Sequence, residues 1–153
     1  MRVEYLNPFY QATGDVFRIM LNLEASRGDL SVVEELVPVS DANIVIGVTG
    51  DLRGSLLYSF PREMALEMVR IMSGMEMKDL DAFVTSALGE VANIISGNAV
   101  TYLSQNGLAC DISPPQIIVG TGNALSMATE KAVVIPLKTS IGTFEINISL
   151  HKV

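Results

Sequence analysis

This sequence has very few residues of the types that build disulfides, metal sites or nucleophilic centres. Among 153 residues there are one cysteine, Cys110, one histidine, His151, and no tryptophan. A single cysteine cannot form an internal disulfide, which agrees with a reducing compartment. One histidine and one cysteine also provide neither a metal cluster nor a nucleophile with its base. We interpret Cys110 as a small buried apolar residue and His151 as an exposed histidine on the polar face of a strand.

Basic residues and long hydrophobic runs are also scarce. Ten Lys and Arg stand against seventeen Asp and Glu, a formal net charge of -7, which opposes the phosphate neutralisation on which nucleic-acid binding depends. No apolar run approaches the roughly 18 residues that span a bilayer, and the N-terminus lacks a signal-peptide hydrophobic region. We expect a cytoplasmic protein that binds no nucleic acid and does not insert into a membrane.

Hydrophobic residues, in contrast, are abundant, at 49% of the chain, whereas charged residues make up 18%. A chain of this length and apolarity can bury enough surface to form one domain with a sizeable core. We therefore treat residues 1–153 as a single domain.

The first half of the sequence changes from a helical period to a strand period. A helix is predicted that begins at Asn7–Pro8 or a few residues earlier and ends near Arg27–Asp29. Strands are predicted at 30–39, 43–49 and 54–60, followed by a short helix from Pro61 to Met72. The predicted buried face of the first helix comprises Phe9, Ala12, Val16, Ile19, Met20 and Leu23.

The second half begins with a longer helix. It is predicted to start at Asp79 or Asp81, either of which can cap it, and to end at Asn106–Gly107. Strands follow at 116–119, 124–128, 131–138 and 141–152. In the last strand, one side is apolar and comprises Phe144, Ile146, Ile148 and Leu150. The other side is predicted to be wet and comprises Thr143, Glu145, Asn147, Ser149 and His151.

The order helix, strands, short helix, helix, strands suggests an internal duplication. A shift of 88 positions pairs Val45 with Val133 and Gly54 with Gly142. We predict an α+β (α/β) fold of two pseudo-repeats, about 1–77 and 78–153, each a long helix plus antiparallel strands. The two halves are expected to share one core.

The second long helix carries a polar stripe opposite its apolar face. At about 100° per residue, the apolar face comprises Val84, Leu88, Val91, Ile95, Ala99 and Tyr102. The opposite stripe comprises Ser86, Glu90, Asn93, Gly97 and Ser104. An exposed Glu and Asn at this spacing are common on helices, and Glu4 and Asn7 share it, so the pair alone indicates no function.

The wider pattern resembles the CheC/CheX/FliY family of chemotaxis phosphatases. Ser86, Glu90 and Asn93 lie at i, i+4 and i+7, Gly97 comes one turn later, and Pro115 follows the end of the helix. The opening Leu6–Phe9 and the order of two helices and two hairpins resemble the CheX branch across nearly the whole chain. CheC-type members carry two such sites, whereas this sequence has one. The resemblance implies a CheC-like fold with the long helices packed on one face of the sheet.

The resemblance also implies a reaction. The substrate would be the phosphoaspartate of a phosphorylated CheY-type response regulator, with Glu90 and Asn93 as catalytic residues. Asn93 would orient the attacking water, and Glu90 would pair with a lysine of the regulator. The chain would need no cofactor or metal of its own, because the regulator supplies Mg²⁺. Ser86 and Gly97 would keep the surface of the helix low enough for a partner to approach, and Pro115 would shape the neighbouring loop.

A homodimer is also expected, from the resemblance and because the long apolar C-terminal strand would otherwise leave an edge open to pairing. Edge-to-edge strand addition is the expected interface. The alternative function is a non-catalytic flagellar-switch or response-regulator-binding module, because FliY-like relatives have a similar fold.

Overall fold

The structure is a computed structural model that describes residues 2–34, 40–120 and 131–153. Its helices are α1 (Val3–Val16), which continues into the π-helical turn η1 (Phe17–Leu21), α2 (Arg62–Ser73) and α3 (Ala82–Gln105). Its strands are β1 (Ser26–Arg27), β2 (Ser31–Val33), β3 (Ala42–Gly50), β4 (Leu52–Phe60), β5 (Cys110–Ile112), β6 (Gln116–Val119), β7 (Ala132–Thr139) and β8 (Gly142–Lys152). Within the described ranges, no helix is both long and apolar enough to cross a membrane.

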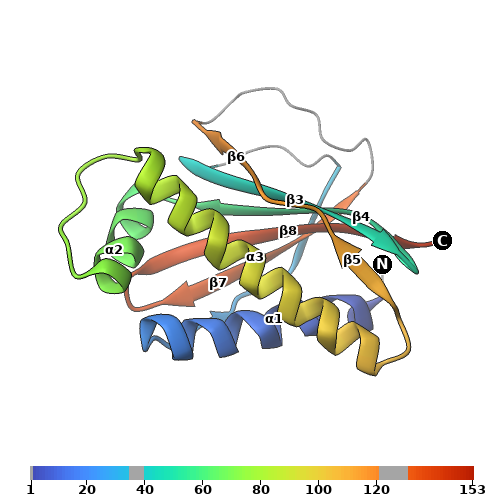
Figure 1. Cartoon of the computed structure of the whole chain (residues 1–153). Coiled ribbons are helices and arrows are strands. Elements are labelled where there is room, and N and C mark those ends of the chain that lie inside the picture. The colour runs from blue at the N-terminus through green and yellow to red at the C-terminus, as the bar shows by residue number, and fades with distance from the viewer. Residues whose placement is uncertain (1, 35–39, 121–130) are drawn as a thin grey trace.

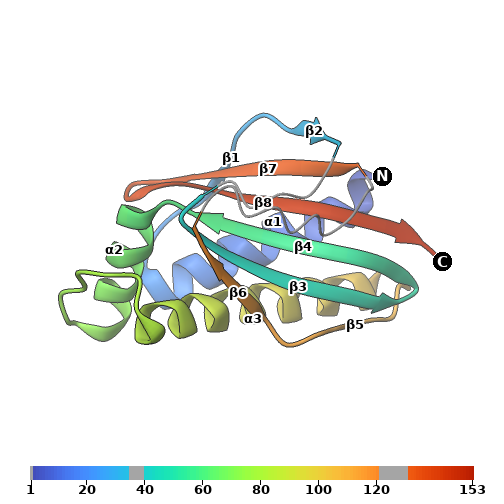
Figure 2. The ribbon, with the colours of Figure 1, turned by 90° about the horizontal axis from the view of Figure 1, so that it is seen from above.

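The strands form one antiparallel sheet in the order β1-β7-β8-β4-β3-β5, with β2 also pairing with β7 and β6 with β3. Figures 1 and 2 show α1 and α3 on one face of this sheet and α2 near one end of it. The predicted α+β fold with its long helices on one face is therefore confirmed. The hairpins β3–β4 and β7–β8 meet through β4 and β8. This arrangement suits the predicted duplication, which stays a prediction.

The strand predictions differ from the structure mainly at the edges of the sheet. Strand β5 was not predicted, and of the strand predicted at 30–39 the structure shows only β2, residues 35–39 lying outside the described ranges. The strand predicted at 124–128 also lies outside them. The expected edge pairing through the C-terminal strand is wrong, because β8 lies between β7 and β4 and both of its sides are already hydrogen-bonded.

The central position of β8 also changes its predicted wet face. The apolar side is buried as expected, with Phe144 1% exposed and stacked on Phe17 and Phe60. On the other side, however, Asn147 is 3% exposed and Ser149 2% exposed. Their cross-strand neighbours on β4 are Leu57 and Ser55, and the Asn147 carboxamide donates a hydrogen bond to the Leu57 carbonyl at 3.4 Å.

Helix α1 begins at Val3, so Pro8 is its sixth residue and leaves the Glu4 carbonyl without the N–H that an α-helix normally provides. The helix ends earlier than predicted, because Asn22 adopts a left-handed conformation with φ 54°. The predicted burial of Ile19 is wrong, since this side chain is 84% exposed. The π-helical turn changes the helical register there and places Phe17 and Leu21 in the core instead.

Helix α3 is fixed at both ends by the residue types expected there. The Asp81 carboxylate accepts a hydrogen bond from the Val84 N–H at 2.9 Å, so Asp81 is the N-cap. The helix ends at Asn106, and Gly107 has φ 86°, a left-handed conformation that glycine adopts without strain. The prediction of both ends is confirmed, with the start resolved in favour of Asp81.

One buried hydrogen bond ties α3 to the centre of the sheet. The Ser96 hydroxyl donates to the Ala92 carbonyl at 2.8 Å, and the hydroxyl of Tyr58, on β4, lies 2.7 Å from the Ser96 oxygen. Since the Ser96 proton is already used, Tyr58 is the donor of this second bond. Burial raises the pKa of the Tyr58 hydroxyl far above its ordinary value of 10.0.

Removing the Tyr58 hydroxyl tests the hydrogen bond between Tyr58 and Ser96. Tyr58→Phe is expected to lower the free energy of unfolding by about 1 kcal/mol in urea denaturation at neutral pH, because a buried hydrogen bond is lost. In the wild type the native Tyr58 keeps its proton while the unfolded chain loses it near pH 10. The stability contribution is therefore complete below that pH and falls as the pH rises through 10. The variant should show a smaller alkaline loss, and identical stability and pH curves would contradict the assignment.

The N-cap of α3 provides a second test with an internal control. Asp81→Ala is expected to lower the free energy of unfolding by about 1 kcal/mol, because the first turn loses a charged acceptor. Asp79→Ala removes a carboxylate whose side chain is 84% exposed and should change stability by less than about 0.5 kcal/mol. Urea denaturation measures both, and equal losses for the two variants would refute the assignment of Asp81 as the cap.

Candidate functional site

The polar stripe of α3 faces away from the core. Ser86 and Glu90 are exposed, and Asn93 and Gly97 are half-buried. The residues of the opposite face that are 0% exposed are Val84, Leu88, Val91, Ile95 and Ala99. The predicted orientation of the stripe is thus confirmed, while the chemical roles of its residues stay predictions.

Glu90 and Asn93 present polar groups that the described chain does not use. Among residues 2–34, 40–120 and 131–153, neither side chain has a hydrogen bond or ion pair. Residues three apart lie on the same side of a helix. The carboxylate and the carboxamide can therefore contact the same bound molecule.

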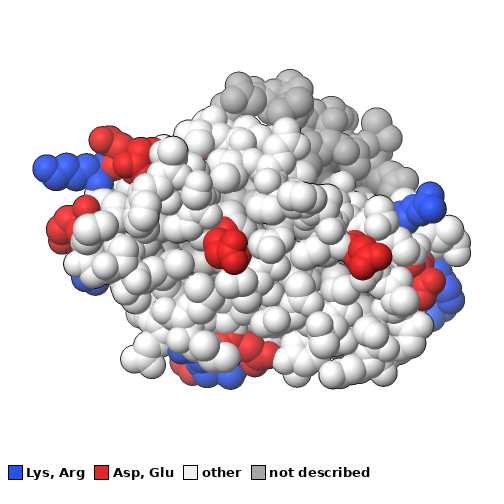
Figure 3. All heavy atoms as spheres, viewed as in Figure 1, with Lys and Arg blue, Asp and Glu red and all other residues white. Residues whose placement is uncertain are grey.

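The surface around the stripe is poor in positive charge. Glu90 is the only charged residue of α3, and the sequence has no Lys or Arg between Lys78 and Lys131. Figure 3 shows a mostly uncharged face over α3, with Lys and Arg at its margins. A phosphate bound here would find no Lys or Arg on α3 itself, so we expect the neutralising charge to come with the bound molecule.

The segment after α3 returns to the stripe through Pro115. A Cβ atom at Gly89 would lie 3.7 Å from Pro115 Cγ and 3.4 Å from Ile117 Cδ1. Ser113 holds this segment on β3: its hydroxyl accepts a hydrogen bond from the Gly47 N–H at 2.8 Å, and its own N–H donates to the Gly47 carbonyl at 2.9 Å. The structure therefore brings Pro115 against α3, as part of a loop that Ser113 fixes. The sequence analysis missed Ser113.

Gly97 leaves an open space on the stripe. A Cβ atom added there would meet nothing within 4 Å in the structure described, and Gly97 is not among the glycines with positive φ. A glycine inside a helix destabilises it by about 1 kcal/mol relative to alanine. The described part of the chain thus gives no packing reason for a glycine here. Because glycine has no side chain, the surface of the helix is lower at Gly97, one turn after Asn93.

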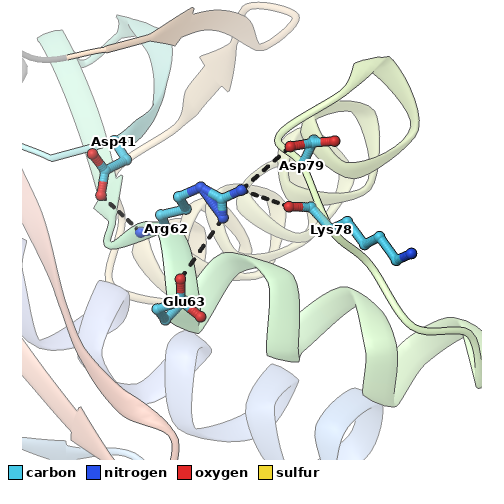
Figure 4. Close-up of polar contacts among 5 residues, drawn as sticks. All are labelled: Asp41, Arg62, Glu63, Lys78 and Asp79. Carbon is cyan, nitrogen blue, oxygen red and sulfur yellow. Dashed lines mark hydrogen bonds and ion pairs between the residues drawn. The ribbon is translucent and has the colours of Figure 1, made fainter.

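The start of α3 is anchored by Arg62, the first residue of α2, as Figure 4 shows. Its guanidinium donates to the Lys78 carbonyl and lies 3.4 Å from the Asp79 carboxylate and 3.7 Å from that of Glu63. Its backbone N–H donates to the Asp41 carboxylate at 2.9 Å. Arg62 therefore joins the start of the β3 hairpin to the segment before α3. The sequence analysis missed this anchor, because the partners lie far apart along the chain.

Two hollows formed by described residues lie away from the stripe. One of about 490 Å³ lies between the beginning of α1 and the end of α3, and one of about 340 Å³ lies between the later parts of both helices. Neither is lined by Ser86, Glu90 or Asn93. Small-molecule sites are usually concave, whereas this stripe is an exposed helix surface. That shape suits a macromolecular partner.

The other residues considered for chemistry do not assemble a second site. Among the described residues, no group of three or more His, Cys, Asp and Glu could hold a metal ion. His151 is exposed, as predicted. Cys110 is half-buried in β5 rather than fully buried, because the short strand lies at the edge of the sheet.

Comparisons with known proteins match this chain to one family. The family model for chemotaxis phosphatase CheX matches residues 42–138, a range that contains the whole polar stripe and Pro115. CheY-P phosphatase CheX from Thermotoga maritima is 35% identical over 121 residues, which cover 78% of this chain and 78% of the relative.

Solved structures agree with this match. Chemotaxis protein CheX from Desulfovibrio desulfuricans superposes with a TM-score of 0.87 and 32% identity, covering 97% of this chain and 100% of that one. CheX from Borrelia burgdorferi, solved as a complex with CheY, BeF3 and Mg²⁺, superposes with a TM-score of 0.78 and 28% identity, covering 99% of this chain and 100% of that one. Fold, motif range and sequence identity agree, and the chain belongs to the CheX family of chemotaxis phosphatases.

Proposed function

We propose that this protein hydrolyses the phosphoaspartate of a CheY-type response regulator, with Asn93 and Glu90 as the residues that act on the substrate. The observation that carries the proposal is the pairing, on the exposed polar stripe of α3, of a carboxylate and a carboxamide that bond to no other described residue. Membership of the CheX family and the likeness to the Thermotoga maritima CheY-P phosphatase support the same reaction.

The reaction needs little covalent chemistry from this chain. A water molecule attacks phosphorus, the bond between phosphorus and the aspartyl oxygen breaks, and the regulator recovers its free carboxylate while inorganic phosphate leaves. Phosphoryl transfer through a loose transition state depends mainly on positioning and electrostatics. The Asn93 carboxamide can hold the attacking water in line with the departing oxygen without carrying a charge that would repel the phosphate.

Glu90 takes the second role, which is docking. A carboxylate beside a phosphoryl group is repulsive unless a cation lies between them, and this chain has no Lys or Arg near Glu90 in sequence. In the proposal, a lysine of the regulator forms the ion pair with Glu90. Such a pair fixes the relative orientation of two proteins more than it adds affinity.

Mg²⁺ belongs to the regulator in this proposal. Mg²⁺ sites use carboxylates together with phosphate oxygens and water, and α3 offers a single carboxylate. The Borrelia burgdorferi CheX complex was solved with CheY, BeF3 and Mg²⁺ together. We assign no cofactor to this chain, whose residues supply positioning alone.

The remaining residues of the motif shape the surface. Ser86 and Gly97 have small side chains at either end of the pair, which lets a partner approach the helix closely. Pro115 packs beside Gly89 and supports the loop next to the stripe.

We also propose a cytoplasmic location and a homodimer, with an interface other than β8, whose two sides are already paired.

A non-catalytic switch or regulator-binding module is the competing function. Such a module would bind the regulator and leave its phosphate in place, so turnover separates the two. The regulator is phosphorylated with acetyl phosphate, and the remaining acetyl phosphate is then removed. A substoichiometric amount of this protein, added to that regulator, should remove the phosphate from all of it. Stoichiometric binding with unchanged phosphate would support the module and contradict the phosphatase.

The division of roles predicts different kinetic defects. Asn93→Ala should lower the rate of dephosphorylation at saturating regulator by about 100-fold or more while binding is largely kept, because a positioning group is lost. Glu90→Ala and Glu90→Gln should also weaken binding, since both remove the charge. Asn7→Ala is the matched control, because Glu4 and Asn7 repeat the spacing on α1. Unchanged turnover by Asn93→Ala would refute the assignment.

Replacing Gly97 by alanine is expected to have opposite effects on stability and on activity. Gly97→Ala should raise the free energy of unfolding by about 0.5–1 kcal/mol, because the helix gains propensity and the new methyl group meets nothing. The same methyl group would stand between α3 and the regulator, so the KM for phosphorylated regulator should rise. A more stable variant with unchanged kinetics would show that Gly97 does not lie under the partner.

A further inference from the structure

The polar stripe of α3 is bordered by exposed apolar side chains. Phe83 is 53% exposed on the first turn of the helix, whereas the other four phenylalanines are each at most 1% exposed. On β6, Ile117 is 36% exposed and Val119 48% exposed. An exposed aromatic ring next to exposed branched residues is typical of a protein interaction surface.

These side chains lie on both sides of the stripe. At about 100° per residue, Phe83 projects within roughly 20° of Glu90, about two turns earlier on α3. Gly89 projects about 100° away on the other side, where an added Cβ atom would lie 3.4 Å from Ile117 Cδ1. Val119 shares the strand face of Ile117 because side chains alternate. Figures 1 and 2 both show β6 running beside the first half of α3.

Both borders are held rigidly in place. Phe83 lies in a first turn capped by Asp81, directly after the segment that Arg62 anchors (Figure 4). Strand β6 is paired with β3, and the Asn43 carboxamide donates to the Ile118 carbonyl at 3.2 Å. A surface that is already ordered loses little conformational entropy on binding.

The small number of charges on α3 limits the kinds of contact that its exposed face can make with a partner. With Glu90 as its only charged residue, α3 cannot bind a partner through many ion pairs. The affinity must then come mainly from burial of apolar surface, and a central aromatic side chain is the commonest anchor of such interfaces.

We propose that Phe83, Ile117 and Val119 form an apolar docking surface for the receiver domain of the phosphorylated response regulator. The inference rests on the proposed function, because a receiver domain that covers Glu90 and Asn93 is expected also to cover Phe83, which borders the stripe beside Glu90. Its contact surface should be an apolar strip beside the phosphorylated aspartate and the lysine that pairs with Glu90.

The test separates binding from turnover. Binding is measured with a CheY-type receiver domain loaded with BeF3 and Mg²⁺, a non-hydrolysable mimic of the phosphorylated state. Phe83→Ala should raise the Kd about tenfold, which corresponds to about 1.4 kcal/mol, and Phe83→Leu should restore most of the affinity. Val119→Ser, on the other border, should raise the Kd several-fold. Val32→Ala is the matched control, because Val32 is 63% exposed on β2, which pairs with β7 at the opposite edge of the sheet.

Kinetics on the phosphorylated receiver domain complete the test. Phe83→Ala should raise KM in step with Kd and leave the rate at saturating receiver within about twofold of the wild type, since Asn93 is unchanged.

If the wild type removes the phosphate and Asn93→Ala does not, but Phe83→Ala and Val119→Ser bind like the wild type, the docking surface is wrong and the phosphatase stands. If the wild type removes no phosphate, the proposed function itself fails. If Phe83→Ala dissociates a dimer in sedimentation and leaves the Kd unchanged, the surface joins two copies of this chain, which also overturns the assignment.

Discussion

The packing of α3 against the sheet is the constraint on which the rest of the structure depends. The apolar face of this helix is completely buried from Val84 to Ala99, and the hydrogen bond between Tyr58 and Ser96 fixes its position over the central strands. A rotation of the helix by one residue, about 100°, would turn Glu90 toward the core and leave a buried, unpaired carboxylate. The same burial that stabilises the fold therefore keeps Glu90 and Asn93 on the surface.

The exposed stripe lacks the cationic groups that would bind a phosphate. It has a carboxylate and a carboxamide, and no Lys or Arg between Lys78 and Lys131 to bind a phosphate. Its surroundings carry few charged residues, as Figure 3 shows, and include the exposed apolar side chains of Phe83, Ile117 and Val119. The proposed division of labour follows: the regulator contributes the phosphoryl group, its metal and a lysine, and this chain contributes water positioning by Asn93 and a shaped surface.

Local patterns in the sequence were sufficient for the parts of the fold that depend on local physics. The amphipathic period predicted α3, its start was narrowed to Asp79 or Asp81, and the alternation of residues 144–150 predicted a strand with one buried face. The burial of Asn147 and the central place of β8 were missed, because the order of strands is set by contacts between distant segments. The Arg62 anchor and the π-helical turn that exposes Ile19 were missed for the same kind of reason. The orientation of the predicted site was accessible because it follows from one helix, whereas the approach of Pro115, Ile117 and Ser113 to its side depends on tertiary structure.

The central claim is that this helix face is half of an active site and becomes complete only with the phosphorylated regulator. Free acetyl phosphate tests it most directly, because it has the same acyl phosphate bond and lacks the regulator's lysine and metal site. With Mg²⁺ present, the protein should leave the hydrolysis rate of acetyl phosphate unchanged and accelerate loss of phosphate from the regulator in the same buffer. Comparable acceleration of both substrates would contradict the account.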